Sequence, residues 1–223
     1  MSGAAYWIGM GDIHGHTASL TRIPELPGAA GVIISGDLTI KGGVAEAGRV
    51  IEAVAAVNPR ILAQIGNMDH EPVQSWLDGK GMGIHARCVE LAPGLALMGV
   101  GWSGPTPFHT PSEVPDSQLG EWLEQAWEQA KAFDHVILVS HTPPHGTTTD
   151  VVGPGAHVGS AAVRGFIERA QPDVCLTGHI HEARSTDTLG RTVVINPGDL
   201  SSGGYAIIGY DGSAVTARLM TIS

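Results

Sequence analysis

Short apolar runs alternate with amphipathic segments along most of this 223-residue chain. Runs rich in Val, Ile and Leu are typical of strands that are buried on both faces of a sheet. The last three predicted strands follow one another without a helix, which favours an antiparallel meander with a hairpin turn at Asp211-Gly212. The full pattern predicts strands at Ala5–Met10, Val32–Ser35, Ile61–Ile65, Leu95–Val100, Val136–Ser140, Val174–Thr177, Thr192–Ile195, Tyr205–Tyr210 and Val215–Met220.

Three segments have helical periodicity instead. The clearest covers about Ser117–Phe133, and a second runs about Val44–Val57 and ends before Pro59. A third begins after Ser160, a suitable N-cap, and ends before Pro172. In the first helix, the apolar face that we expect in the core consists of Leu119, Trp122, Leu123, Ala126, Trp127 and Ala130. We find no internal repeat, so we expect one domain over residues 1–223, with two packed sheets flanked by helices.

Charge and cysteine usage narrow the function classes. The formal net charge is −10, and an acidic surface repels nucleic acid backbones, so a polymeric nucleic acid partner is not expected. The N-terminus lacks the basic region of a signal peptide, and no apolar stretch approaches the ~20 residues that span a bilayer. Cys88 and Cys175 form no CxxC motif and are expected to be buried free thiols. These features predict a cytoplasmic protein without a membrane partner.

Five short blocks with metal-ligand chemistry each follow an apolar run. Their carboxylates, imidazoles and single carboxamide suit two divalent cations that share one site. Each block also has an ordinary explanation as a capping aspartate, a Gly-Asn turn or a core histidine. A shared metal site explains why all five stand at the ends of predicted strands. The blocks are Asp12-Ile13-His14, Gly36-Asp37, Gly66-Asn67-Met68-Asp69, Ser140-His141 and Gly178-His179-Ile180-His181.

We expect both D-x-H and H-x-H to present their side chains together, because residues i and i+2 of an extended chain point the same way. Two long segments, 102–115 with His109 and 143–159 with His145, carry no clear periodicity. Long ordered segments of this kind often carry function, although they also serve as stiff connectors.

From Met10 to Pro197, the chain resembles the calcineurin-like metallophosphoesterase superfamily, whose pattern is D-x-H, G-D, G-N-H-[DE], H and G-H-x-H. The resemblance implies an α/β fold, a four-layer αββα sandwich with two central mixed β-sheets. It implies two divalent metal ions, from Mn, Fe, Zn, Co or Ni, with Mn expected in vitro. The implied ligands are Asp12, His14, Asp37 and His181 for one ion and Asp37, Asn67, His141 and His179 for the other, with Asp37 bridging.

The implied activity is hydrolysis of small phosphate esters by a hydroxide that bridges the two ions. Such ions lie ~3.5–4 Å apart and lower the pKa of the bridging water toward neutrality. They also neutralise charge on the phosphoryl oxygens, so that no protein nucleophile is required. The main alternative is a non-catalytic, metal-stabilised scaffold that binds other proteins.

The chain departs from the family pattern at Met68, where the family usually has a histidine that helps to protonate the leaving group. A thioether has no proton to give, so we expect a preference for phosphodiesters with good leaving groups, such as aryl or nucleoside diesters. By the resemblance, Asp69 is a candidate catalytic residue, although its usual histidine partner is missing. His145, then His109 and His16, are candidates to replace that histidine, although each is more readily explained as a surface residue.

Candidate substrate contacts are assigned in the same way. Asn67 and His109 are expected at the substrate. Lys41 would meet phosphate there as a point charge, and a solvated surface lysine explains it equally well. Ile40 stands where the family's second block often has a further acid.

Overall fold

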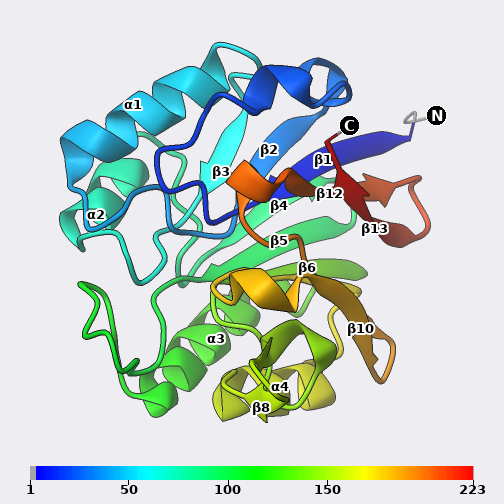
Figure 1. Ribbon diagram of the computed structural model, residues 1–223. Coiled ribbons are helices and arrows are strands. Elements are labelled where there is room, and N and C mark those ends of the chain that lie inside the picture. Colours follow the sequence, from blue (N-terminus) through cyan, green and yellow to red (C-terminus); the bar gives the residue numbers. More distant parts are fainter. Residues whose placement is uncertain (1–3, 223) are drawn as a thin grey trace.

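The computed structural model describes residues 4–222 and shows two β-sheets packed face to face, with helices on each outer face (Figure 1). The first sheet has the strand order β13-β12-β1-β2-β3. Strands β1, β2 and β3 are parallel, whereas β12 runs antiparallel to β1 and to β13. Their bounds are Ala5–Met10 for β1, Gly31–Ile34 for β2, Ile61–Ala63 for β3, Gly204–Tyr210 for β12 and Val215–Thr221 for β13.

The second sheet has the order β10-β11-β9-β6-β5-β4. Its four inner strands β11, β9, β6 and β5 are parallel, and both edge strands pair antiparallel. The bounds are Cys88–Ala92 for β4, Leu95–Val100 for β5, His135–Ser140 for β6, Val174–Leu176 for β9, Ser185–Leu189 for β10 and Thr192–Asn196 for β11. A small hairpin outside both sheets joins β7 (Val151–Val152) to β8 (Ala156–His157).

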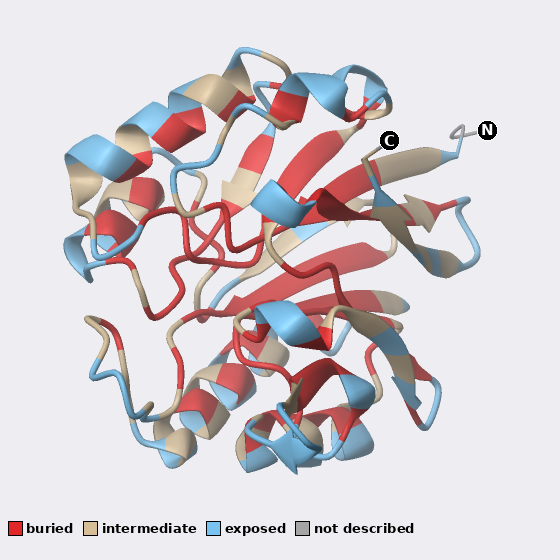
Figure 2. Ribbon diagram, in the orientation of Figure 1, coloured by how far each residue is buried: buried red, intermediate tan, exposed pale blue. Residues whose placement is uncertain are grey.

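Each sheet has its own helical layer. Helices α1 (Val44–Ala55) and α2 (Pro72–Gly79) contact one another beside the first sheet, and α3 (Asp116–Ala130) and α4 (Ala161–Ala170) contact one another beside the second (Figure 1). Buried side chains form three apolar layers, one between the sheets and one beneath each pair of helices. Figure 2 shows the same layering, with buried strands in the middle and exposed helix faces outside. The predicted αββα sandwich is therefore confirmed.

One predicted arrangement is wrong. Strand β11 does not form a meander with β12 and β13 but lies in the other sheet, parallel to β9 and antiparallel to β10. The hairpin between β12 and β13 does form, although its loop extends over residues 211–214 rather than a two-residue turn. Asp211 stabilises that loop by accepting hydrogen bonds from the main-chain nitrogens of Ser213 and Ala214.

The pattern also missed several short elements, among them α2, β4 and β10. Both strands are sheet edges, and β10 reads Ser-Thr-Asp-Thr-Leu, so neither has the continuous apolar character of a buried strand. Both cysteines are free, and Cys175 is buried as expected, but Cys88 on the edge strand β4 is only half-buried. No helix within residues 4–222 has the length and apolar character needed to cross a membrane.

Candidate metal centre

The predicted metal ligands meet where the carboxyl ends of the parallel strands face one another across the sandwich. Asp12, Asp37 and Asn67 follow β1, β2 and β3 of the first sheet, and His141 and His179 follow β6 and β9 of the second. Ligands of α/β proteins characteristically bind at this edge, because parallel strands all end there. The main-chain nitrogen of His179 donates to both carboxylate oxygens of Asp12, at 3.1 and 3.0 Å, and so links the two sheets at the site.

The backbone at these positions is strained rather than extended. Asp12, His14, Asp37 and His179 have positive φ angles of 49°, 48°, 51° and 67°. The left-handed conformation is costly for residues other than glycine, and such strain collects at functional sites. The prediction that D-x-H and H-x-H are extended is therefore wrong, and the side chains converge because tight left-handed turns aim them.

One half of the centre consists of Asp12, His14 and His181, whose ligand atoms lie within 4.8 Å of one another. His181 Nε2 lies 3.3 Å from Asp12 Oδ1 and 3.1 Å from His14 Nε2. His14 Nδ1 lies 3.1 Å from the carbonyl oxygen of Thr39. Because a carbonyl only accepts, Nδ1 carries the proton and the lone pair of His14 Nε2 faces the cluster.

The other half consists of Asp37 and His141, with Asp12 within reach of both. Asp37 Oδ2 lies 3.6 Å from His141 Nε2 and 3.8 Å from His14 Nε2, so this carboxylate stands between the two halves. The other oxygen, Oδ1, accepts a 2.8 Å hydrogen bond from the main-chain nitrogen of Met68. Asn67 Oδ1 lies 3.0 Å from His141 Nε2, which places the only amide of the predicted ligand set beside the same imidazole.

Two glycines leave the room that this cluster needs. A Cβ atom at Gly66 would lie 2.1 Å from Asp37 Oδ1 and 2.5 Å from His141 Cε1. At Gly178 it would lie 2.4 Å from Asp12 Oδ2. Real Cβ atoms do not approach other atoms this closely, so the glycines of the G-N-M-D and G-H-I-H blocks are there because backbone and ligands pack against one another.

The cluster carries strong local electrostatics. Burial lowers the pKa of His141, but the neighbouring Asp37 carboxylate outweighs burial and raises this pKa to about 9. Burial raises the pKa of Asp37, but His141 outweighs it and keeps the pKa of the carboxyl below its usual value. His179 lies with its ring centroid 5.2 Å from that of His141, and burial together with the His141 charge lowers its pKa to about 4. A neutral imidazole at His179 retains a lone pair for a metal.

The residues fit a divalent cation. Asp12 and Asp37 are buried, at 1% and 2% exposure, and within residues 4–222 neither forms an ion pair with Lys or Arg. Their ionic neighbours are imidazoles, and carboxylate oxygens with imidazole nitrogens are ligands that manganese, iron, zinc, cobalt and nickel accept. Buried carboxylates are otherwise costly, and bound cations are a usual means of compensating them.

Asp69 lies behind the cluster. Its carboxylate is buried and accepts hydrogen bonds from the main-chain nitrogens of Leu38, Thr39 and Gly66 and from the Thr39 hydroxyl. Burial, and secondarily the charge of Asp37, raises the pKa of Asp69 to about 7. The contacts show Asp69 bracing the loops that carry Asp37 and Asn67, and a direct role in catalysis stays a prediction.

The other predicted residues lie at the surface. Lys41, His109, His145 and His16 are all exposed, and Lys41 and His109 also have left-handed backbone, with φ angles of 55° and 48°. The His145 ring neighbours that of His157, at 5.8 Å between centroids, and within the described chain it makes no hydrogen bond to the cluster. Their roles as proton donors or substrate contacts stay predictions.

Asn196 lies in a segment that the sequence analysis did not assign to the site. It hydrogen-bonds to the backbone of the G-H-I-H block. It is fully buried, and its side-chain nitrogen donates to the carbonyl oxygens of Ile180 and Thr149, at 2.9 and 3.2 Å. Ile180 separates the two histidines of the G-H-I-H block, so Asn196 fixes the turn that presents them. The apolar pattern alone cannot indicate such a role, because Asn196 is simply the last residue of β11.

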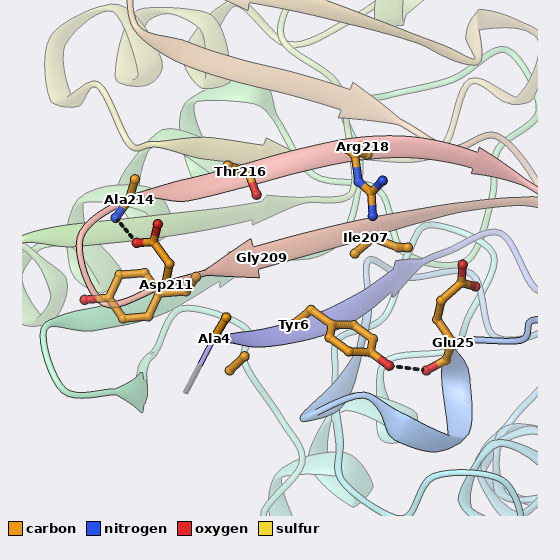
Figure 3. Close-up of a pocket in the computed structure, with 11 residues that line it drawn as sticks. Ala4, Tyr6, Glu25, Ile207, Gly209, Asp211, Ala214, Thr216 and Arg218 are labelled. Carbon is orange, nitrogen blue, oxygen red and sulfur yellow. Dashed lines mark hydrogen bonds between the residues drawn. The ribbon is translucent and has the colours of Figure 1, made fainter. Parts of the chain in front are cut away.

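A separate hollow of about 340 Å³ lies on the first sheet near the start of β1 (Figure 3). Tyr6, Ile207, Thr216 and Arg218 line it, and the Tyr6 hydroxyl donates to the main-chain oxygen of Glu25 at 2.9 Å. None of the predicted ligands lies there.

Comparison with known proteins agrees with the fold. Residues 120–219 match the model of a family described as metallophosphoesterase, calcineurin superfamily. Over 197 residues the chain is 34% identical to an uncharacterized protein of Methanocaldococcus jannaschii, and the match covers 85% of this chain and 86% of that protein.

Two solved structures share the fold. A protein from Thermus thermophilus is 20% identical, with a TM-score of 0.72 over 99% of this chain and 100% of that one. A dimetal phosphatase from Danio rerio is 13% identical, with a TM-score of 0.62 over 98% of this chain and 99% of that one. With its ordered ligand blocks, its αββα sandwich and these relatives, the chain belongs to the calcineurin superfamily of metallophosphoesterases.

Proposed function

We propose that this protein hydrolyses phosphodiesters with good leaving groups, using two divalent metal ions held between the two sheets. The observation that carries the proposal is the position of Asp37, whose Oδ2 atom lies within 4 Å of both His14 Nε2 and His141 Nε2. A buried carboxylate between two imidazoles, without a lysine or arginine partner in the described chain, is suited to bridge two cations.

The ligands divide between the two ions, and each ion would be held by residues of both sheets. Asp12, His14, Asp37 and His181 would hold one ion, and Asp37, Asn67, His141 and His179 the other. When bound, two such ions supply a nucleophilic hydroxide near neutral pH and neutralise charge on phosphoryl oxygens.

The choice of substrate rests on Met68. Its side chain is half-buried and its main-chain nitrogen supports Asp37, but its thioether supplies no proton to a departing oxygen. General acid catalysis typically contributes ~10²–10⁴-fold, so esters with poor leaving groups lose most from its absence.

The surface beside the site suits an apolar leaving group. Phe108, which is 77% exposed, and His109 lie on the 102–115 loop. The residue after them, Thr110, accepts a hydrogen bond from the Asn67 side chain, so this part of the loop lies next to the site. Lys41 stands two residues beyond Thr39, whose carbonyl orients His14. We assign phosphate contact to Lys41, Asn67 and His109, and proton donation to His145 if the leaving group requires it.

A substrate panel tests the proposal. Protein supplied with Mn²⁺ should hydrolyse bis-(4-nitrophenyl) phosphate, and it should turn over alkyl phosphate monoesters at least ~10²-fold more slowly. Asp37→Asn should abolish the activity, whereas Asp134→Asn, at an exposed aspartate, should retain it. Metal binding with no turnover of any ester would favour the scaffold instead, and faster hydrolysis of alkyl esters than of aryl diesters would refute the substrate assignment.

A further inference from the structure

We propose that Glu113 is a positioning residue for the metal centre: through Thr110 it holds the Asn67 amide with its oxygen toward the metal and its nitrogen away. The inference rests on the proposed metal function. It is carried by a continuous run of hydrogen bonds that leads from the 102–115 loop to Asn67.

The Asn67 side chain has two ends of similar shape, of which only one can bind a cation. Its Oδ1 atom lies 3.0 Å from His141 Nε2, within the cluster, and its Nδ2 atom lies 2.9 Å from Thr110 Oγ1, outside it. Rotating the amide by 180° would turn an NH₂ group, which is a donor only, toward the metal. The correct orientation therefore needs an acceptor at the outer position.

Thr110 is that acceptor because its hydroxyl hydrogen is already used in a hydrogen bond to Glu113. A hydroxyl has one proton to give, and Thr110 Oγ1 donates it to Glu113 Oε1 at 2.6 Å. The lone pairs of Thr110 are then left for the Asn67 NH₂ group. An ionised carboxylate can only accept a hydrogen bond. Thr110 must therefore donate to Glu113, and Asn67 Nδ2 must donate to Thr110.

Glu113 is itself held in place and ionised. The same Oε1 atom accepts hydrogen bonds from the Thr110 main-chain nitrogen at 2.7 Å and from Thr106 Oγ1 at 2.6 Å. Burial would raise the pKa of Glu113, but the hydrogen bonds from Thr106 and Thr110 outweigh it and lower the pKa to about 2. Glu113 therefore carries its charge throughout the pH range in which metals bind histidine.

The main chain of the loop is docked at the same place. The Ser112 nitrogen donates to the Asn67 carbonyl oxygen at 3.0 Å, and the Ser112 hydroxyl donates to the Asp69 carbonyl oxygen at 2.6 Å. The two ends of the loop are also joined, because the Val114 main-chain nitrogen donates to the carbonyl oxygen of Ser103 at 2.9 Å. Asn67 is thus fixed by the loop through both its backbone and its side chain.

Thr110 offers a matched pair of variants. Thr110→Val keeps the shape and removes the hydroxyl, whereas Thr110→Ser keeps the hydroxyl. Loss of a residue that orients a metal ligand typically weakens metal binding ~10–100-fold. In calorimetric titration of metal-free protein with Mn²⁺, we expect such a loss for Thr110→Val at one of two sites, and near wild-type binding for Thr110→Ser. Glu113→Ala should weaken the same site, and Glu121→Ala, at an exposed glutamate of α3, should not.

A second readout needs no metal. In metal-free protein with ¹⁵N-labelled asparagine, the Asn67 side-chain NH₂ signals should shift and exchange faster with solvent in Thr110→Val, and remain in place in Thr110→Ser. Wild-type Mn²⁺ affinity in Thr110→Val, or unchanged Asn67 signals, would overturn the positioning role while leaving the metal function intact. If the wild-type protein binds no metal, the proposed function fails with it.

Discussion

The two ends of β1 show how differently one strand can be used. At its carboxyl end, Asp12 has left-handed backbone, and its buried carboxylate faces histidines of the other sheet. At its amino end, Tyr6 lies in ordinary strand geometry beside the hollow of Figure 3, and its hydroxyl is satisfied by a main-chain oxygen. The amino end borders a hollow of about 340 Å³ that none of the predicted ligands lines, so a hollow alone does not mark the functional end. Backbone strain and buried carboxylates surrounded by histidines mark the functional end.

The largest expected effect comes from removing a charge at the carboxyl end. Asp12→Asn should lower phosphodiesterase activity by ~10³-fold or more, because ligation of a divalent ion contributes several kcal/mol to transition-state stabilisation. Asp211→Asn, at an aspartate that lines the hollow, should leave the activity unchanged. Steady-state assays with Mn²⁺ measure both, and equal losses in the two variants would contradict the contrast between the ends.

Adding a single methyl group at Gly66 should also damage the metal centre. Its Cβ would lie 2.1 Å from Asp37 Oδ1, so Gly66→Ala must displace a ligand, and overpacking of this kind costs ~1–3 kcal/mol. We expect a lower midpoint of thermal unfolding and weaker Mn²⁺ binding. Gly165→Ala in α4, where an added Cβ would meet no atom within 4 Å beyond the nearby helix backbone and its chain neighbours, should stabilise the protein slightly. Mn²⁺ binding by Gly66→Ala as tight as that of the wild type would contradict the close packing of Gly66 against Asp37.

Acid should loosen the loop that reaches Asn67. The pKa of Glu113 is about 2 in the folded protein, below its usual value of 4.5, so the carboxylate stabilises the fold above about pH 4.5. This contribution is lost as the pH falls through the folded pKa. Glu113→Gln should therefore be less stable than wild type near neutral pH and approach it near pH 2. A constant difference in the free energy of unfolding across that range would exclude the ionised carboxylate as the cause.

The smallest effect is expected at the amino end. Tyr6→Phe removes one hydrogen bond, to the Glu25 main-chain oxygen, and should cost about 1 kcal/mol of folding stability. Catalytic activity and Mn²⁺ affinity should match wild type. Urea denaturation measures the stability of Tyr6→Phe, and the diester assay measures its activity. A change in KM would mean that the hollow is energetically coupled to the metal centre.

The sequence was informative about the site because its ligands stand next to regular elements. Asp12, Asp37 and His141 each follow an apolar run closely, so the pattern that predicts the strand also places the ligand at its carboxyl end. The geometry of the turns was not predictable from propensity, because left-handed backbone at aspartate or histidine opposes local preference and is imposed by the packed surroundings.

Other features depend on contacts between distant residues. The pairing of β11 with β9 rather than β12 is a choice among partners that no local pattern encodes. Glu113 lies 46 residues from Asn67 in a proline-rich loop without periodicity, and only the folded structure brings Thr110 between them.

Metal stoichiometry tests the account most directly. Metal-free protein titrated calorimetrically with Mn²⁺ should bind two ions per chain, and Asp37→Asn should weaken both sites, because its carboxylate stands between the two groups of ligands. Absence of Mn²⁺ binding to the wild-type protein, or unchanged binding to Asp37→Asn, would contradict a shared two-metal centre.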